Sequence, residues 1–600
     1  MGSRAGRGSR AGKTAGKIES QAKPSPRTPL WIAAACIAIA TIAAFLPALG
    51  AGFVAYDDPE NFLQNPHYRG LGLAQLRWMW TTTHLGHYVP LSWMTLGLDY
   101  VLWGMNPAGY HAVNLLLHAA NAVMLLFIAR RLYRLAGIGA LGTGITTVAP
   151  AAFAALAFAV HPLRVESVAW ITERRDMVSL AFSLAAVLSY LRSTEGGSRS
   201  RRWYWLAVGS FVCALLSKAT AVTLPAALLV VSVYPLRRVG GAAGWWSASS
   251  REAYRELIPF GVASLAAGVG SLIALTPGVQ LALGDKLAVS AYSFAFYLWK
   301  TIAPTNLAPL YERRLPIPAW SPTFLASYAA AVLVLAAAWF ARRRFPGVTA
   351  ALVVFIAAIF PLLGFVQNGP QIAADRYTYH AAPALAVLAG AALAMYNQRA
   401  LLIGAAAAVA GWGILTNRQA RVWTNSESLW MRVLQFDSVS YVANNNLGVV
   451  LAEQGRSAEA IERYRRSIRT RPAFKYSHNN LGYELAQRGE LEPAIAEFRE
   501  ALAIDSTYTD AEVNWGNALV QLRRFDDAVV HYAAAARFDP ERAAIHFNWG
   551  IALREQGDVP GAIEQYERAL TLDPDMVDAR RELTDAVAAL REARDRSIPR

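Results

Sequence analysis

Long apolar runs across the first two thirds of the chain restrict its fold more than any other feature. Hydrophobic residues make up 54% of the 600 residues and charged residues only 16%, whereas about a quarter of a soluble domain is charged. Runs of about 16–25 apolar residues can cross a bilayer as helices, which satisfy their own backbone hydrogen bonds. Twelve such runs begin near Leu30, Tyr110, Ile145, Met177, Trp203, Thr220, Leu257, Leu287, Thr323, Val348, His380 and Leu401. The sequence therefore predicts an all-α protein, with a polytopic membrane bundle at residues 30–417 and a soluble half at 418–600.

Basic residues between these runs indicate how the chain crosses the membrane. Residues 1–29 are rich in Lys, Arg, Gly, Ser and Pro, which predicts a disordered cytoplasmic tail and a first helix that runs outward. With twelve spans, the arginines at 342–344 would face outside. If the run at 287–303 is instead an interfacial or re-entrant helix, about eleven spans remain, these arginines lie inside, and the C-terminal half is extracytoplasmic. Twelve spans remain the alternative.

The distribution of charge also bears on partners and location. The net charge of +15 comes mainly from loops between apolar runs, so it fits membrane topology rather than a nucleic-acid-binding stripe, and no nucleic acid is expected. Both cysteines, Cys36 and Cys213, fall inside apolar runs, so no disulfide framework is expected. The Ala- and Arg-rich composition points to a bacterium of high genomic GC content, and hence to its inner, cytoplasmic membrane.

The C-terminal half repeats at a fixed period of 34 residues. An Asn-Leu-Gly or Asn-Trp-Gly triplet occurs at 446–448, 480–482, 514–516 and 548–550. Alanines and aromatic residues recur at the same step, and three of the four units close with Pro. This is the tetratricopeptide pattern, in which stacked helix pairs form a superhelix with a concave binding face. We expect residues 575–598 to form a capping helix and the concave face to bind a protein.

Two adjacent carboxylates follow the first apolar run at the water boundary of the membrane. Asp57 and Asp58 open the first external segment, residues 51–109. They are either solvated loop acids or the acid–base group of a membrane enzyme. His84 and His87 could join them around a metal, but they lie in a Gly-containing loop, and neither a Cys ligand nor a helical His–carboxylate motif supports one. We expect no metal and no other cofactor.

Further ionisable groups lie within or beside the apolar runs, where they are costly and therefore candidates for function. The candidates are His111, His161, Glu166, Arg174, Arg175, Asp176, Lys218, Asp375, Arg376 and Tyr377. His111 belongs to a polar stripe along one face of its helix. Hydrogen bonds between helices would explain this stripe just as readily as contact with a substrate would. Several cations at the membrane face of the Asp pair would suit a phosphate-bearing lipid, because an Arg can donate two hydrogen bonds to a phosphate.

Five stretches together resemble the transmembrane and tetratricopeptide-repeat-containing O-mannosyltransferase family, whose membrane half has the GT-C glycosyltransferase fold. They are YDDPENFLQN, HYVPLSWMTLGLDYVLWGMNPAGYHAVNLLLHAANAVML, FAVHPLRVESVAWITERRDMVS, LLSKATAV and AADRYTYHAAP, and the repeats follow in the same order. The resemblance covers most of residues 30–575. It implies that a sugar, mannose in the family, moves from a polyprenyl-phosphate donor to a Ser or Thr hydroxyl of a protein recruited by the repeats.

The resemblance also places the family's motifs on this chain. Its acidic pair falls on Asp57 and Asp58, and its Arg-x-Asp motif falls on Arg174 and Asp176. Its Lys-Glu element falls on Lys218, here followed by Ala instead of Glu. Its Glu-Arg-Tyr motif becomes Asp375-Arg376-Tyr377, with Asp in place of Glu.

Elementary chemistry assigns roles to these groups. A carboxylate can take the proton of an acceptor hydroxyl as it attacks the anomeric carbon, and cations can stabilise the departing phosphate. We expect Asp57 to be the base and Asp58 to orient it or the acceptor. Arg174, Arg175, Lys218 and Arg376 are the phosphate-side candidates, and a one-step attack inverts the anomeric centre. The alternatives are a non-catalytic repeat scaffold of an envelope assembly and a lipid or solute transporter.

Overall fold

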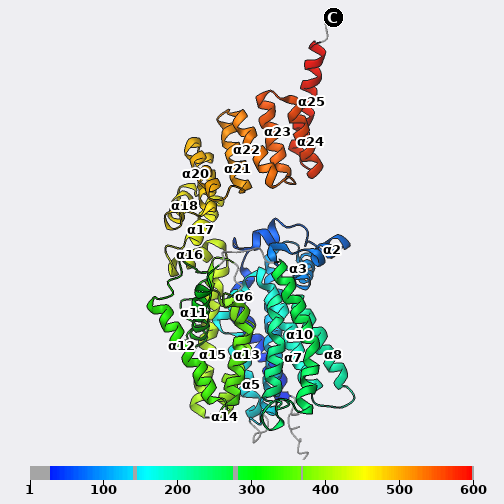
Figure 1. Cartoon of the computed structure of the whole chain (residues 1–600), viewed down its shortest axis with the longest axis vertical. Helices are drawn as coiled ribbons and strands as arrows, with labels where there is room; N and C mark the ends of the chain where they lie inside the picture. Colours follow the sequence, from blue (N-terminus) through cyan, green and yellow to red (C-terminus); the bar gives the residue numbers. More distant parts are fainter. Residues whose placement is uncertain (1–27, 139–144, 275–280, 366–368, 397, 598–600) are drawn as a thin grey trace, which may run out of the picture.

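The computed structural model describes residues 28–138, 145–274, 281–365, 369–396 and 398–597. Figure 1 shows a bundle of helices with a curved stack of helix pairs above one end. Residues 1–27 of the expected basic tail lie outside the described residues. The bundle contains α1 (Thr28–Phe45), α2 (Leu73–Thr81), α3 (Pro90–Trp103), α4 (Pro107–Leu135), α5 (Ile145–Ala159), α6 (Val165–Ala169), α7 (Arg174–Ser193), α8 (Ser200–Leu215), α9 (Leu224–Val233), α10 (Ala248–Ala274), α11 (Leu283–Ile302), α12 (Pro322–Ala341), α13 (Pro346–Ile359), α14 (Ala382–Tyr396) and α15 (Arg399–Ala420).

Each apolar run expected from the sequence contains or directly precedes a helix. Within the described residues, five helices are long and apolar enough to cross a membrane: Thr28–Gly50, Pro107–Leu135, Ala248–Ala274, Pro322–Ala341 and Arg399–Trp423. A sixth crossing is made if Val148–Ala159 and Pro162–Ala169, bent by 53°, form one broken span. The expected all-α fold of apolar helices followed by tetratricopeptide repeats is confirmed. The count of eleven spans, the interfacial placement of α11 and the domain limits stay predictions.

The repeat half stacks helix pairs through the small and aromatic residues of its 34-residue period. Its helices are α16 (Ser426–Phe436), α17 (Tyr441–Glu453), α18 (Ser457–Thr470), α19 (Lys475–Gln487), α20 (Leu491–Ile504), α21 (Thr509–Gln521), α22 (Phe525–Phe538), α23 (Ala543–Gln556), α24 (Val559–Leu572) and α25 (Val577–Ser597). The triplet glycine of each first helix faces an aromatic ring of the second. A methyl group on Gly448 would lie 2.5 Å from the Tyr464 ring. Only glycine therefore allows the two helices to pack this closely.

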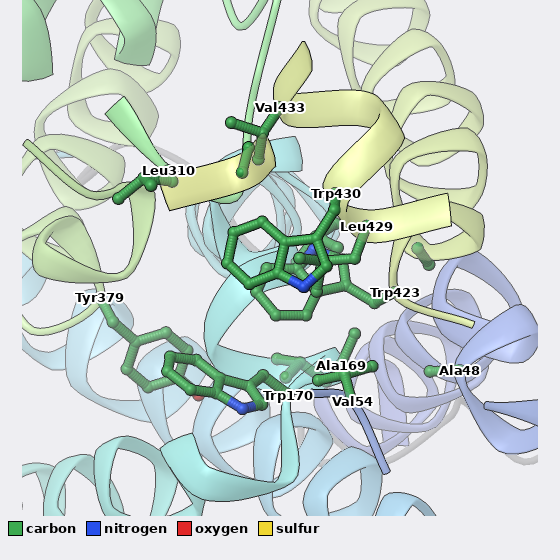
Figure 2. Close-up of a cluster of buried hydrophobic side chains, with 14 of the residues drawn as sticks. Ala48, Val54, Ala169, Trp170, Leu310, Tyr379, Trp423, Leu429, Trp430 and Val433 are labelled. Atoms are coloured by element: carbon green, nitrogen blue, oxygen red, sulfur yellow. The ribbon is translucent and has the colours of Figure 1, made fainter. Parts of the chain in front are cut away.

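Helix α16 joins the repeats to the membrane half and packs on its first external segment. Figure 2 shows Trp423, Leu429 and Trp430 lying against Val54 and Trp170. Both tryptophans of this joint are buried, at 1% and 0% exposure, and a buried aromatic side chain removes roughly 150–250 Å² from water. The two halves therefore share one apolar core, and the repeats are not free to swing at this point.

Hydrogen bonds tie the same joint to the backbone just before the Asp pair. The Gly52 amide donates to the Thr424 carbonyl (3.0 Å), and the Ala55 amide donates to Ser426 Oγ (2.8 Å). Trp430 Nε1 donates to the Ala55 carbonyl (3.0 Å). Because these groups are partly or fully removed from water, leaving one unpaired would cost about 1–3 kcal/mol. The position of the acidic segment therefore depends on α16.

A short antiparallel pair of strands forms a second contact between the halves. Strand β1 (Tyr311–Glu312) pairs with β2 (Gln371–Ala373). The Glu312 carboxylate accepts hydrogen bonds from Ser440 Oγ (2.6 Å) and the Val442 amide (3.2 Å) at the start of α17. A carboxylate is stabilised there by the free amides and dipole of a helix N-terminus.

Candidate functional site

The two adjacent carboxylates face different surroundings. Asp58 is 1% exposed and accepts three hydrogen bonds, from the Val54 amide (2.9 Å), Trp170 Nε1 (2.9 Å) and Thr172 Oγ1 (2.7 Å). Burial raises the pKa of Asp58 to about 7, against these three donors, which lower it. Asp58 thus fixes the loop rather than facing a ligand.

Asp57 is partly exposed, and its carboxylate accepts no hydrogen bond from the described residues. Its backbone is held by Asn61, whose Nδ2 donates to the Asp57 carbonyl (2.8 Å) and to Thr172 Oγ1 (3.2 Å). Burial raises the pKa of Asp57, and the nearby cations Arg175 and Arg376 lower it by less. The net effect is a raised pKa. This carboxylate is therefore both available and more basic than a solvated one, as a general base requires.

A polar cavity of about 220 Å³ opens on Asp57. Its lining includes His84, His87, Thr172 and Arg175 together with apolar residues of α3. His84 Nε2 lies 3.2 Å from the Glu60 carbonyl oxygen. The charge of Arg175 is the largest cause that lowers the pKa of His87, so this ring is neutral and can donate or accept a hydrogen bond.

Behind this cavity, three cations surround the buried carboxylate of Glu173. The carboxylate lies 2.8 Å from Arg175 Nη2, 2.7 Å from Lys218 Nζ and 3.4 Å from Arg376 Nε. Burial raises the pKa of Glu173, but Arg175, Lys218 and Arg376 outweigh it and hold the pKa well below its usual range. Arg175 Nη1 has no partner among the described residues, and Lys218 uses two of its three donors. The cluster can therefore still donate to an anion.

An apolar groove of about 210 Å³ lies on the other side of the cations. It is formed by α4, α7, α9, α13 and α14, and Leu180, Val231 and Leu388 are typical of its lining. Two polar atoms in it, Thr220 Oγ1 and His380 Nε2, are buried without a hydrogen-bond partner among the described residues.

The polar end of this groove connects to the cation cluster. His380 Nδ1 lies 3.6 Å from Asp176 Oδ1, and the same oxygen accepts a hydrogen bond from Lys218 Nζ at 2.7 Å. A chain of side-chain contacts therefore leads from Arg175, which lines the cavity at Asp57, through Glu173 and Lys218 to Asp176 and His380 at the apolar groove. Such a path matches a molecule with a polar head, an anionic link and an apolar tail.

Arg376 is held at this site by a residue 210 positions earlier in the chain. Its guanidinium pairs with the buried Glu166, whose carboxylate also accepts from the Arg376 amide at 2.9 Å. Its guanidinium carbon lies 5.3 Å from the centre of the Trp170 ring. Trp170 Nε1 also donates to Asp58, so the Trp170 side chain contacts both the Asp pair and Arg376.

Arg174 and His111 do not join the cluster. Arg174 is 0% exposed and donates to Asp99 (2.6 Å), the Tyr110 carbonyl (2.8 Å) and the Asn114 side chain. The geometry therefore favours Arg175 over Arg174 at an anion. His111 is buried in α4 beside the backbone of residues 51–52.

The remaining candidates contact protein groups at the edge of the site. His161 Nε2 lies 3.1 Å from the Thr301 carbonyl oxygen, and the ring packs on Trp412. Asp375 accepts from the Tyr311 hydroxyl (3.1 Å), and the Tyr377 hydroxyl accepts from Gln371 (2.8 Å). These contacts position strands β1 and β2 and the loop that carries Arg376.

Glu173, Thr220 and His380 had no predicted role from sequence alone. Glu173 adjoins the Arg-Arg-Asp motif and His380 ends the AADRYTYH stretch, so proximity to motifs was the available signal. Thr220 lies within the LLSKATAV stretch, two residues after Lys218, and offered the same signal. In the described part of the chain, no group of three or more His, Cys, Asp or Glu side chains is arranged to hold a metal ion.

Comparison with known proteins gives matches to both halves. A family model described as Tetratricopeptide repeat matches residues 445–509 and 513–577. The human protein O-mannosyl-transferase TMTC1 is 25% identical over 502 residues, which are 73% of this chain and 55% of the human protein. The Xenopus laevis protein O-mannosyl-transferase tmtc2 is 32% identical over 211 residues, 32% of this chain and 23% of the relative. The chain thus spans about half the length of the first relative and less of the second.

Among solved structures, the repeats are similar to YrrB, described as a TPR protein with an unusual peptide-binding site. The identity is 21%, the match covers 26% of this chain and 80% of YrrB, and the TM-score is 0.24.

Proposed function

We propose that this membrane protein is a glycosyltransferase. It would move a sugar from a polyprenyl-phosphate donor to a Ser or Thr hydroxyl of a protein, because the chain is a relative of the tetratricopeptide-repeat-containing protein O-mannosyltransferases. The relatives named above are protein O-mannosyl-transferases, so mannose is the first sugar to test. The observation that carries the proposal is the path from the polar cavity at Asp57, past Arg175 and Lys218, to the apolar groove.

The donor is placed by matching its three parts to this path. Its prenyl chain lies in the groove among α4, α7, α9, α13 and α14, where burying apolar surface contributes about 25 cal/mol per Å². Its phosphate lies at the cations, with the unpaired donors of Arg175 and Lys218 and the unpaired Thr220 hydroxyl within the same region. Its sugar then extends into the cavity lined by Asp57 and His87.

The transfer is a single displacement. The Asp57 carboxylate takes the proton of the acceptor hydroxyl while its oxygen bonds to the anomeric carbon. The bond from that carbon to the phosphate oxygen breaks, and the electron pair leaves with the polyprenyl phosphate, stabilised by Arg175, Lys218 and Arg376. The anomeric centre is inverted. A positioned base of this kind contributes about 10²–10⁴ in rate.

No step of this scheme uses a metal, and we propose that the reaction needs none. Asp58 holds the loop, and Glu173 pairs with Arg175, Lys218 and Arg376 and offsets their mutual repulsion. Because basic loops favour the cytoplasmic side, we propose that the site lies on the extracytoplasmic face of the bacterial cytoplasmic membrane.

The test is transfer by the purified full-length chain in lipid nanodiscs. A panel of radiolabelled polyprenyl-phosphate sugars, mannose included, is incubated with envelope proteins and with the wild type or the Asp57→Asn variant. We expect label in protein with the wild type, its loss with the variant, and an inverted anomeric configuration in the product by NMR. Transfer that persists in the variant would exclude Asp57 as the base. Absence of transfer with every donor would favour a non-catalytic scaffold, and donor movement across the bilayer of sealed proteoliposomes that contain the chain would favour a transporter.

A further inference from the structure

A second polar cavity, of about 300 Å³, lies in the repeat half. It is formed by α20, the second helix of one pair, and by α21 and α22, the next pair in the stack (Figure 1). The buried side chains of Ile495 and Leu519 and the exposed side chain of Val530 give it apolar surface. Its volume is at the lower limit of the roughly 300–1,000 Å³ of small-molecule pockets, so it suits a small ligand or one end of a larger one.

The indole ring of Trp515 forms part of the lining. This ring stacks on the His531 imidazole, with ring centroids 4.0 Å apart, and His531 Nδ1 lies 2.6 Å from Glu512 Oε2. These contacts fix the plane of the indole before any ligand arrives. Trp515 Nε1 and His531 Nε2 have no hydrogen-bond partner among the described residues. The cavity thus offers an aromatic ring with unused polar atoms at its edge.

Four exposed charged side chains complete the lining, two carboxylates and two guanidinium groups. Arg524 Nε donates to Asp527 Oδ2 (2.9 Å), and Arg524 Nη1 lies 3.9 Å from Glu492 Oε1. Within the described part of the chain, the Arg499 guanidinium and the Glu492 carboxylate make no hydrogen bond. Because exposed ion pairs are weak, these groups keep donors and acceptors available for a ligand.

The balance of charge among these four groups argues against a charged ligand. An anion would face two carboxylates as well as two guanidinium groups, and a cation would face the same mixture. A neutral ligand rich in hydroxyl groups suits both kinds of group, because each hydroxyl donates one hydrogen bond and accepts others. Hydrogen bonds with one charged partner are also stronger than those between neutral groups.

We infer that this cavity binds a neutral hexose unit of a saccharide, with one face of the sugar ring against Trp515. The C–H bonds on that face carry partial positive charge, and the face of an aromatic ring carries partial negative charge, so the two attract each other. The hydroxyl groups at the edge of the sugar ring then reach the carboxylates and guanidinium groups around the indole.

Stacking of the repeats does not require this set of side chains. At the corresponding positions of the next joint, 34 residues later, Ala533 and Asp558 stand in place of Arg499 and Arg524. Trp549 keeps the aromatic ring there, but its Nε1 is buried without a hydrogen-bond partner among the described residues. The repeats stack at that joint without the two guanidinium groups, so packing alone does not account for them.

The experiment measures sugar binding by the full-length chain in nanodiscs, without a polyprenyl-linked donor. The probes are the neutral methyl glycosides of mannose, glucose and galactose, the anionic methyl galacturonoside and the uncharged nucleoside adenosine. The variants are Arg499→Gln and Trp515→Leu, the latter introducing the residue type of Leu481 in the preceding repeat, and the matched control is Trp549→Leu in the following repeat. Saturation-transfer-difference NMR gives Kd, with empty nanodiscs as the blank, and circular dichroism confirms that each variant is folded.

We expect at least one neutral methyl hexoside to bind with a millimolar Kd. Trp515→Leu should weaken this binding about tenfold or more because it removes the aromatic face, and Arg499→Gln about threefold or more because it removes charged donors. Trp549→Leu should bind within about twofold of the wild type. Wild-type affinity in the folded Trp515→Leu variant, tighter binding of the galacturonoside or of adenosine, or no binding of any neutral hexoside would overturn the inference.

Two larger probes identify the source of the sugar. A hexosyl-threonine peptide represents a glycoprotein, and a linear hexose trimer represents a polysaccharide. The probe that binds more tightly, and loses affinity in Trp515→Leu, names the source, whereas failure of both to bind would overturn the inference. Trp515-dependent binding by a chain that transfers no sugar would support the inference and count against the proposed function alone.

Discussion

Replacing each carboxylate of the Asp pair by its isosteric amide separates catalysis from loop stability. Asp57 makes no side-chain hydrogen bond to the described residues and is partly exposed, so Asp57→Asn should change the free energy of unfolding by no more than about 0.5 kcal/mol. Because the variant has lost its base, turnover should fall by about 10²–10⁴.

Asp58→Asn should instead lower the stability of the fold more than Asp57→Asn does, and turnover less. At pH 6, below the pKa of about 7 to which burial raises Asp58, the wild-type carboxyl is mostly neutral, so the substitution changes little charge. The amide oxygen can still accept from Trp170 and Thr172, but the amide nitrogen now faces the Val54 N–H, which loses its only acceptor among the described residues. Val54 is 2% exposed, and a buried unsatisfied donor costs about 1–3 kcal/mol.

The assay compares apparent melting temperatures and turnover at pH 6 for both purified variants in the same detergent. We expect Asp58→Asn to melt roughly 2–6 °C below the wild type and to keep more activity than Asp57→Asn, which should melt with the wild type. A fall in melting temperature for Asp57→Asn alone, or the greater loss of turnover in Asp58→Asn, would refute the assigned roles.

Three other substitutions and one change of pH test neighbouring groups. Since the base must be unprotonated and burial raises the pKa of Asp57, kcat should fall as pH is lowered through a value above the ordinary one of about 4; a kcat that is constant down to pH 4 would contradict this. Arg175→Lys keeps the charge but loses donors of the guanidinium, so KM for the donor should rise about 3–10-fold with kcat little changed; an unchanged KM would place the phosphate elsewhere. Leu388→Trp narrows the groove and should raise KM for long-chain donors, measured against a farnesyl-phosphate donor as control; equal effects on both would count against the groove. Trp430→Phe removes the donor to the Ala55 carbonyl and should lower kcat several-fold without changing the binding of the acceptor protein; wild-type kcat would mean that α16 does not position the acidic segment.

The sequence predicted the fold because its signals are local. A helix that crosses a membrane must be a continuous apolar run, and a 34-residue repeat fixes which residues pack within each pair. The glycine of each triplet and the alanines of the second helices occupy the contacts that their spacing implied.

The sequence pointed to candidate site residues by their type but not to their arrangement. Arg174 and Arg175 are adjacent and chemically identical, yet a rotation of about 100° along the helix points one at Asp99 and the other at Glu173. Thr220 and His380 line the groove only because the segments that precede α9 and α14 are brought together from distant parts of the chain. The packing of α16 on the acidic segment joins residues more than 370 positions apart. No local pattern encodes such contacts.

The most direct test of the central claim is photo-crosslinking of a donor that carries a diazirine on its first isoprene unit. The full-length chain in nanodiscs is irradiated with this donor, with and without excess unlabelled donor, and the modified residues are located by mass spectrometry. The account predicts label on α9 and α14, near Thr220 and His380, that the unlabelled donor abolishes. Label confined to the outer faces of α10 and α12, or label that competition does not reduce, would contradict it.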